Sequence, residues 1–255
     1  MTATLSIDPR IEARRREVQR ENDRTRMRRF AIGAAVAAVL VAAAAATRSP
    51  LLDVDEVELV GAQHTSLEEV LVASGISVGD PMLELDLDGA RSRIAALPWV
   101  ESVRTDRDWP GRVSFVITER DPAAQVALGD GWAVVDEDGR VLEVRPEAAA
   151  ALTAIEGAAG SEEPGGWLAS DALELVALAG SLEPVVADRV TAVGRTETGG
   201  LYLDLNNNAT VRVGTIDDLS PKLLSVRTVL EQVALDCLAV LDVRVPTVPV
   251  ITRSC

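Results

Sequence analysis

The sequence is poor in the side chains that most enzymes and nucleic-acid-binding proteins use. It has one histidine, His64, two cysteines, and only 3% aromatic residues in a chain of 255. A Ser-His-Asp or Cys-His site needs a histidine beside its nucleophile, and His64 lies in a predicted turn before a helix. The sequence also lacks the G-x-S-x-G, S-x-x-K, H-E-x-x-H, P-loop and G-x-G-x-x-G motifs. These absences favour a scaffold without a cofactor over a catalyst.

Two short patterns resemble ion or redox sites but do not complete one. Asp136, Asp138 and Gly139 follow the start of a calcium loop. The third ligand position and the distal glutamate are missing, so a hairpin turn is predicted and no metal site. The two cysteines, Cys237 and Cys255, are spaced for neither a metal site nor a redox pair. In an exported chain they form either a disulfide that pins the tail to the end of a helix or two free thiols.

Charge is distributed unevenly between the start of the chain and the rest. Of 25 basic and 40 acidic side chains, residues 1–29 hold nine arginines and five acids, which leaves 16 basic and 35 acidic residues. A surface with such an excess of negative charge repels nucleic acid and anionic lipid. The scarcity of aromatic residues also argues against base stacking. We therefore expect no nucleic-acid partner.

An uninterrupted apolar run, Phe30–Thr47, separates these two parts. As a helix its 18 residues cover roughly 27 Å, close to the hydrocarbon thickness of a bilayer. Arginines before the run and few positive charges after it predict a single membrane-spanning helix, with residues 1–29 in the cytoplasm and the remainder outside. A cleaved signal peptide ending near Ala44–Ala46 is the main alternative, although a head of 29 residues is long for one. A buried core helix explains neither the flanking charge nor the missing polar face.

The residues after Pro50 predict two extracytoplasmic domains of an α+β fold. The first, residues 51–121, has the order β-α-α-β-β. Its strands and helices are indicated by a strand ending at Gly61, capping-box spacing from Thr65 and Ser66, a helix capped by Asp86 or Asp88, and two strands around the turn Trp109–Gly111.

The second predicted domain, residues 122–245, is larger and richer in strands. It contains a hairpin around residues 136–139, an amphipathic helix over Ser170–Ser181 and a helix that opens at Ser220–Pro221. Its last predicted strand is Leu238–Val245. Residues 246–255 are assigned to a tail, because Pro246 and Pro249 disfavour a longer central strand.

Several short motifs, in this order and spacing, resemble the bacterial cell division family FtsQ, called DivIB in some bacteria. The segments that carry the resemblance are Val57–Gly61, Gly79–Pro81, Leu97-Pro98-Trp99-Val100, Trp109-Pro110, Val116–Pro122 and Trp132–Gly139. The resemblance covers the chain from the apolar run onward. The composition, rich in alanine and arginine and poor in lysine, suggests an actinobacterium.

This resemblance implies a POTRA domain next to the membrane, at about Leu51–Asp121, followed by a β domain of antiparallel strands and flanking helices. It also implies a non-enzymatic scaffold of the divisome that crosses the plasma membrane once. Such scaffolds join FtsB and FtsL (DivIC in some lineages) at the septum. They help control septal peptidoglycan synthesis by FtsW and its transpeptidase partner.

The resemblance further indicates where a partner binds, since a late edge strand of the β domain accepts a partner strand by β-augmentation. Arg244 aligns with an arginine that pairs with an acidic partner residue, and Arg195 matches a second such arginine. A solvated charge at a strand end is the other explanation for Arg244. Proline at positions 246 and 249 removes ladder donors and predicts a shorter pairing. The residues of the matching strand are Leu241, Asp242, Val243, Arg244 and Val245.

Two other classes of protein compete with this interpretation. A membrane-anchored or secreted cell-wall enzyme needs a catalytic cluster in a cleft, and the sequence points to none. An export or outer-membrane assembly component needs several POTRA units or a C-terminal barrel. The sequence predicts one such unit and no series of barrel strands of about ten residues.

Overall fold

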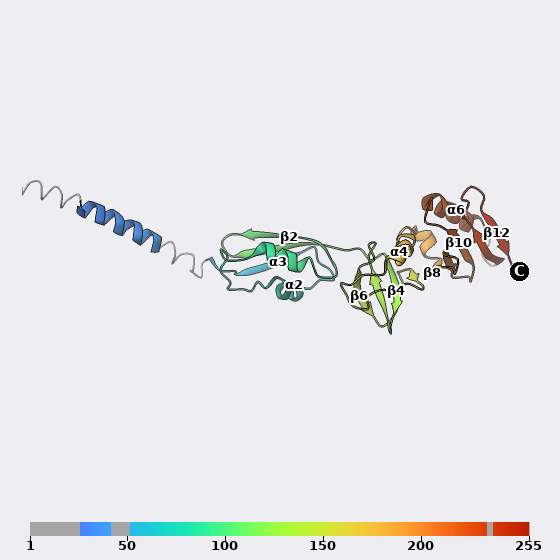
Figure 1. The fold of residues 1–255 in the computed structure, drawn as a ribbon, viewed down its shortest axis with the longest axis horizontal. Coiled ribbons are helices and arrows are strands. Elements are labelled where there is room, and N and C mark those ends of the chain that lie inside the picture. The colour runs from blue at the N-terminus through green and yellow to red at the C-terminus, as the bar shows by residue number, and fades with distance from the viewer. Residues whose placement is uncertain (1–25, 42–51, 234–236, 255) are drawn as a thin grey trace, which may run out of the picture. The chain divides into compact units, whose positions relative to one another are not determined.

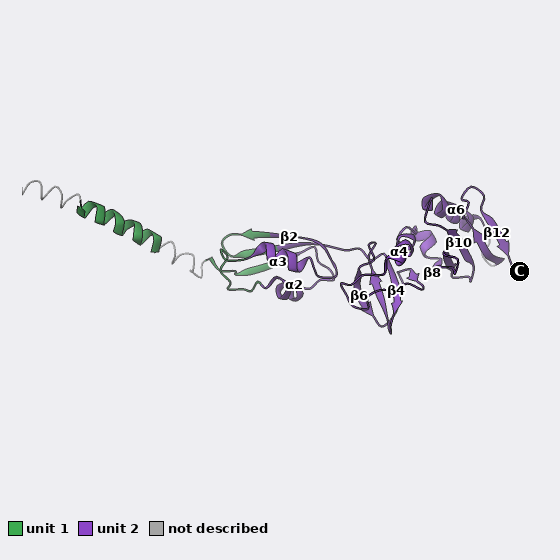
Figure 2. Ribbon diagram, in the orientation of Figure 1, with its two compact units in different colours: residues 1–58, 76–85, 106–114 green, residues 59–75, 86–105, 115–255 purple. Residues whose placement is uncertain are grey.

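We describe the fold from a computed structural model of the chain (Figure 1), which describes residues 26–41, 52–233 and 237–254. The chain divides into two compact units (Figure 2). The first comprises residues 1–58, 76–85 and 106–114, and the second comprises residues 59–75, 86–105 and 115–255.

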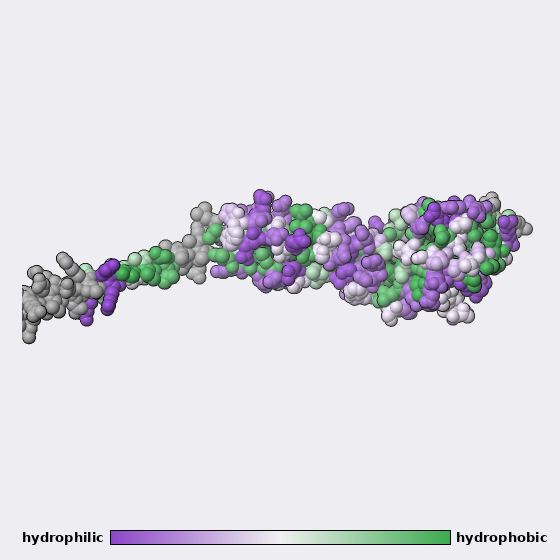
Figure 3. All heavy atoms as spheres, turned by 90° about the horizontal axis from the view of Figure 1, so that it is seen from above, coloured by the Kyte–Doolittle hydropathy of each residue, from purple (hydrophilic) through white to green (hydrophobic). Residues whose placement is uncertain are grey.

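A helix over residues 26–41 begins with hydrophilic arginines and continues with apolar residues (Figure 3). Among the residues that the structure describes, no helix has both the length and the apolar character needed to cross a membrane. Residues 42–47 of the predicted span lie outside the described residues. The membrane-spanning helix over residues 30–47 therefore stays a prediction.

The next part of the chain has the predicted order β-α-α-β-β. Its three strands form one sheet in the order β1-β3-β2. The elements are β1 (Glu56–Val60), α2 (Leu67–Ser74), α3 (Leu87–Ile94), β2 (Val100–Asp108) and β3 (Arg112–Glu119).

Helix α2 begins at one of the two predicted capping boxes. The Ser66 amide donates to the Glu69 carboxylate at 2.7 Å, and the Glu69 amide donates to Ser66 Oγ at 3.2 Å. This pair satisfies two of the amide groups that a helix start leaves without partners. The Thr65 amide instead donates to the carboxylate of Glu119 at 2.7 Å, so the second predicted box does not form. The helix ends at Gly75, whose φ of 67° suits glycine.

The rest of the chain forms a nine-stranded sheet in the order β12-β11-β10-β9-β8-β7-β4-β5-β6. The strands are β4 (Ala124–Leu128), β5 (Gly131–Val135), β6 (Val141–Arg145), β7 (Ala154–Ile155), β8 (Val190–Arg195), β9 (Leu201–Leu205), β10 (Thr210–Gly214), β11 (Leu238–Asp242) and β12 (Val250–Arg253). The helices are η2 (Ser170–Ala172), α4 (Leu173–Gly180), α5 (Pro184–Ala187) and α6 (Leu219–Gln232). The mixed α+β fold is thus confirmed.

Pairing in this sheet is mixed, whereas the resemblance implied antiparallel strands. Strand β7 pairs in parallel with both β4 and β8, and β10 pairs in parallel with β11. Parallel neighbours require a crossover connection, and α6 lies in the connection from β10 to β11. The remaining pairs are antiparallel.

Helix α6 begins earlier than the sequence predicts. Its first residue is Leu219 and its N-cap is Asp218, which has a φ of 53°, so Ser220 does not act as the cap. Lys222, the only lysine in the sequence, is 3% exposed, and its ammonium donates to the carbonyl of Thr215 at 2.8 Å. This bond ties the first turn of α6 to the chain that follows β10.

The hydrophobic core of this larger part consists of aliphatic side chains that pack on the nine-stranded sheet. Valine, leucine and alanine side chains from β4 to β11, α4 and α6 form one continuous buried cluster. Its largest fully buried members include Ile155, Leu178, Leu201, Leu203 and Leu241. Burial of such side chains stabilises the fold by about 1.5–3 kcal/mol each.

Candidate partner-binding edge

The nine-stranded sheet ends at two strands, β6 and β12. The first half of β6 is covered by a loop: Val141 donates its amide to Gly166 at 2.9 Å and accepts from Gly165 at 2.8 Å. Strand β12 pairs with β11 on one side and, within the described residues, with no strand on the other. An unpaired row of backbone donors and acceptors is a template for another strand. The open edge of this sheet is therefore β12.

The prediction that Leu241–Val245 is itself the edge is wrong. Strand β11 lies between two partners, because Leu241 is opposite Val211 of β10 on one side and Ile251 of β12 on the other. Leu241 and Val243 are both fully buried, at 0% exposure, so their side chains belong to the core and not to a contact surface. The strand also ends at Asp242 instead of Val245.

Arg244 is the exposed member of the predicted set, and its guanidinium is paired within the chain. Its Nε and Nη2 donate to both oxygens of Asp242, at 3.0 Å and 2.6 Å. These hydrogen bonds hold the pKa of the Asp242 carboxyl below its usual range. The Arg244 side chain is 62% exposed, against 20% for Asp242. In contact with solvent such a pair contributes little to stability, so Arg244 is free to exchange partners at low cost.

Arg195, the second predicted arginine, is held more firmly. Its guanidinium donates to Glu174 Oε2 at 2.8 Å and to the carbonyls of Gly199 and Asp171 at 3.0 and 3.1 Å. The side chain is 32% exposed. These bonds connect the end of β8 to η2 and the start of α4, which gives Arg195 a structural role in this chain.

The two arginines lie at the same end of the sheet. Arg195 of β8 is opposite Leu201 of β9, which is opposite Gly214 of β10. A side chain at Gly214 would meet Arg244 Cγ at 2.9 Å, and its φ of 80° also favours glycine. Three steps between neighbouring strands place the two arginines roughly 14 Å apart. They can therefore contact one partner only if it crosses the ends of these strands.

The residues around β12 expose apolar surface. Val245, Val248 and Val250 are 58%, 64% and 57% exposed. Leu224 on the neighbouring α6 is 59% exposed, and the adjacent Ser225 donates its hydroxyl to the carbonyl of Pro246 at 2.6 Å. Apolar side chains exposed beside an open strand edge are available for contact with another chain.

Cys237 lies directly before β11 and is disulfide-bonded. Its carbonyl accepts a hydrogen bond from the Ser254 amide at 3.0 Å. The only other cysteine in the sequence is Cys255, which lies outside the described residues.

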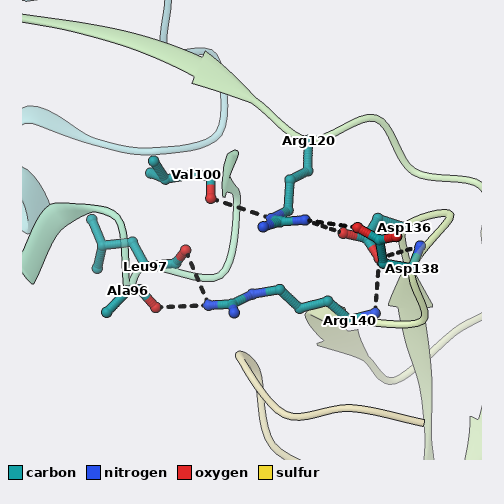
Figure 4. A network of polar contacts seen from close by, with 7 residues as sticks. All are labelled: Ala96, Leu97, Val100, Arg120, Asp136, Asp138 and Arg140. Atoms are coloured by element: carbon teal, nitrogen blue, oxygen red, sulfur yellow. Dashed lines mark hydrogen bonds and ion pairs between the residues drawn. The ribbon is translucent and has the colours of Figure 1, made fainter. Parts of the chain in front are cut away.

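A second arginine–aspartate pair lies far from β12 in the sequence, around the turn between β5 and β6. Arg120 Nη1 contacts Asp136 Oδ2 at 2.7 Å, and its Nε donates to the Val100 carbonyl at 3.2 Å (Figure 4). Asp136 Oδ1 also accepts the amides of Asp138 and Arg140, at 3.1 and 2.8 Å. Asp136 is thus the organising residue of a hairpin turn, as predicted, and its carboxylate is saturated by donors.

Arg140 completes this network from the other side of the turn. Its Nη2 donates to the carbonyls of Ala96 and Leu97, at 2.8 and 3.5 Å (Figure 4). Burial lowers the pKa of the guanidinium, and the positive charge of Arg120 lowers it further. The two arginines therefore tie the residues between α3 and β2 to the β5–β6 hairpin.

Glu119, next to Arg120, organises the turn that holds His64. Its carboxylate accepts the amides of His64 and Thr65, at 2.9 and 2.7 Å, and contacts His64 Nδ1 at 3.1 Å. The His64 ring stacks on Trp99 with 3.9 Å between centroids. Burial raises the pKa of Glu119, but these hydrogen bonds outweigh it and lower the pKa to about 2. The one histidine in the chain is thus a structural residue beside a helix start.

The described residues do not assemble a catalytic or metal site. Among them, no group of three or more His, Cys, Asp or Glu side chains is placed to hold a metal ion. A shallow hollow of about 900 Å³ is lined by Arg120, by acidic side chains such as Glu101 and Asp121, and by small residues of α4. His64 is not among its lining residues, so it offers no nucleophile–histidine pair.

The most important element of this candidate edge that was not predicted from the sequence is β12, because its residues were assigned to the tail. The signal was present: Val250, Ile251 and Thr252 are β-branched residues that favour strands. The two prolines before them obscured it. In the structure these prolines lie in the turn between β11 and β12, outside both strands.

Comparison with known proteins matches two family profiles to this chain. Residues 52–120 match the POTRA domain, FtsQ-type, and residues 124–244 match Cell division protein FtsQ/DivIB, C-terminal. The first match covers the three-stranded part, and the second covers the larger sheet up to residue 244, which is before β12.

Individual proteins are also similar to this chain. The cell division protein FtsQ of Corynebacterium glutamicum is 24% identical over 201 residues, which are 79% of this chain and 89% of that protein. The FtsQ of Mycolicibacterium smegmatis is 27% identical over 72% of this chain, and the match spans 54% of its length. The structure of the major extracytoplasmic domain of DivIB from Geobacillus stearothermophilus matches 46% of this chain and 99% of that domain, with 17% identity and a TM-score of 0.32.

Proposed function

The chain belongs to the FtsQ/DivIB family of bacterial cell division proteins, and from this premise we propose that it is a scaffold of the divisome that recruits its partners through the open edge of β12. Members of this family are non-enzymatic, so the competing interpretation as a cell-wall enzyme is not favoured. The observation that carries the proposal is the unpaired outer side of β12 at one end of the nine-stranded sheet.

The proposed location follows from the sequence and the family. Proteins of the family act at the septum in association with the membrane. In our proposal the apolar residues 30–47 cross the plasma membrane once, residues 1–29 remain in the cytoplasm, and the part from residue 51 onward lies outside. Residues 51–121 form the membrane-proximal POTRA domain and residues 122–254 form the β domain. Extending this domain to residue 254 includes β12, which had been assigned to the tail.

The proposed recognition is β-augmentation. A strand of an FtsB- or DivIC-type partner adds to the outer side of β12, so that backbone hydrogen bonds supply affinity and neighbouring side chains supply selectivity. The exposed valines at positions 245, 248 and 250 provide the apolar contacts of such a strand. Arg244 exchanges Asp242 for an acidic partner residue, which its exposure permits. FtsL and the septal synthase FtsW with its transpeptidase join through this complex.

Depletion with complementation tests this function. Cells that lose the protein are expected to form filaments or branches with blocked septa, and the wild-type gene is expected to restore division. A variant with Arg244→Glu and Val245→Glu reverses the charge and places a carboxylate in the apolar contact, so it is expected to fail despite normal protein levels. Normal septation on depletion would remove the assignment.

A matched control separates the edge from general surface changes. Val144 lies on β6 at the opposite end of the sheet and is 38% exposed. Val144→Glu therefore introduces one carboxylate, as Val245→Glu does, on an edge strand that the proposal does not use, and it is expected to complement. If both variants complement fully, the β12 edge is not the recruiting surface.

A further inference from the structure

Strand β12 buries very little of its own surface. It has four residues, and of these only Ile251 packs, partly buried, against the core. Its other side chains, including Val250 and Arg253, are exposed. A strand with one apolar anchor gains little from the hydrophobic effect, so terminal strands of this kind fray readily. Something besides core packing must hold β12 in register if it is to template another strand.

One end of the β11–β12 hairpin is held by its turn. Asp242 of β11 is opposite Val250 of β12, and the Val248 amide donates to the Val245 carbonyl at 3.1 Å. The bond from Ser225 to Pro246 fixes this turn to α6. At this end the strand cannot leave without breaking contacts of the turn.

The other end is held by Cys237. Leu238, its neighbour, is opposite Arg253, and the Ser254 amide donates to the Cys237 carbonyl. Cys237 is disulfide-bonded, and Cys255 is the only other cysteine in the chain and directly follows Ser254. A bond between these two sulfurs would close the hairpin at the end opposite its turn. It would therefore act at the point where β12 otherwise begins to separate from β11.

We propose that the Cys237–Cys255 disulfide is the positioning element of the β12 edge, so that the oxidised chain presents this edge to a partner strand and the reduced chain does not. The expected effect on partner binding rests on the proposed function. The stabilisation of β12 by this disulfide, called the clasp below, can be tested without a partner. Reduction by a dithiol adds two electrons and two protons to the cysteine sulfurs, while the dithiol is oxidised to a disulfide. Loss of β12 would also uncover the outer side of β11 and present a different edge.

Hydrogen–deuterium exchange of the full-length chain in detergent tests the clasp. Backbone amides of residues 250–254 are compared in the oxidised protein, in the protein reduced with dithiothreitol, and in a Cys237→Ser, Cys255→Ser double variant. Exchange in β12 is expected to rise at least tenfold in both reduced forms, while β9 changes by less than twofold. Equal protection of β12 in all three forms would overturn the proposal.

Joining the reduced thiols with dibromobimane tests whether a new covalent link restores the protection of β12 from exchange. Each thiol displaces one bromide, so the two sulfurs are joined again by a link that dithiothreitol does not cleave. Protection of β12 is expected to return with this link. A purely chemical effect of the reductant on the rest of the chain would not be reversed, and failure of the rescue would count against the clasp.

Binding of the organism's own FtsB-type protein, measured by biolayer interferometry, separates this inference from the proposed function. Binding that weakens at least tenfold on reduction and returns with dibromobimane supports both. If β12 loses protection on reduction while binding of the partner is unaffected, the clasp stands and the β12 edge is not the binding surface. If protection and binding both survive reduction, the edge stands and the positioning role of the disulfide is wrong.

Discussion

Two of the arginine–aspartate pairs among the described residues have similar geometry and very different surroundings. Arg120 and Asp136 meet at 2.7 Å with 18% and 3% of their side chains exposed, whereas Arg244 and Asp242 meet at 2.6 Å with 62% and 20% exposed. Distance alone does not distinguish them. The two pairs differ in their burial and in their further hydrogen bonds, because the Asp136 carboxylate also accepts hydrogen bonds from two backbone amides.

This difference in burial distinguishes a pair that stabilises the fold from a pair whose arginine is available to another protein. Removing one partner of a buried pair leaves a charge without compensation, while an exposed pair exchanges its partner for water or for another carboxylate at little cost. The residues around Arg120 are therefore suited to hold the β5–β6 hairpin against the segment after α3. Arg244 is suited to bind a second chain.

The largest expected effect is at the buried pair. Arg120→Met leaves the Asp136 carboxylate without its cation and should destabilise this part of the protein by roughly 3–5 kcal/mol. Urea denaturation followed by circular dichroism measures the loss. Arg104→Met, at an exposed position on β2, is the matched control and should change the stability by less than about 0.5 kcal/mol. Equal effects of both variants would refute the structural role of Arg120.

A smaller effect that depends on pH is expected at Glu119. The pKa of this group falls from its usual value of 4.5 to about 2 in the folded protein, so the folded state binds fewer protons than the unfolded state between these values. The resulting stabilisation, about 3 kcal/mol, is complete above pH 4.5 and is lost as the pH falls towards 2.

Glu119→Gln tests this dependence, because glutamine keeps the shape and cannot ionise. The variant should be less stable than the wild type at pH 7, and the two should converge near pH 2. Free energies of unfolding measured from pH 2 to 7 give the comparison. A constant difference across this range would mean that the carboxylate's charge is not responsible.

The smallest effect on stability is expected at Arg244. Arg244→Ala should leave the free energy of unfolding close to that of the wild type, since exposed ion pairs contribute little to stability. Arg244→Glu should nevertheless reduce co-purification of the proposed FtsB- or DivIC-type partner. Unchanged recovery of the partner with a folded Arg244→Glu protein would show that the exposed pair is not used for recognition.

Much of the fold could be predicted from the sequence because local signals and tertiary packing agree. Alternating apolar residues marked β3, and Asp86 caps α3 as one of the two predicted residues. Besides β12, the strands β4 and β7 escaped prediction; β7 has only two residues, and the positions of both depend on pairing with other strands. Local propensity carries little information about such pairing.

The candidate site was predictable only in part. Arg244 could be identified from its motif, but the order of strands could not, and it is this order that places β11 in the interior and β12 at the edge. The interior position of β11 depends on its parallel pairing with β10, and a whole helix separates the two strands in the sequence. Nor could the hydrogen bond from Arg195 to Glu174 be predicted from the sequence.

The burial of Lys222 has a practical consequence for mapping the partners of this protein. Because it is the only lysine and is 3% exposed, amine-reactive reagents have no accessible side-chain target in the described part of the chain. Crosslinking by such reagents would miss contacts at β12 even if they were extensive. Photoactivatable or carboxyl-directed crosslinkers do not depend on lysine and can detect these contacts. A lysine introduced at a chosen exposed position would provide a single accessible site for labelling of side-chain amines.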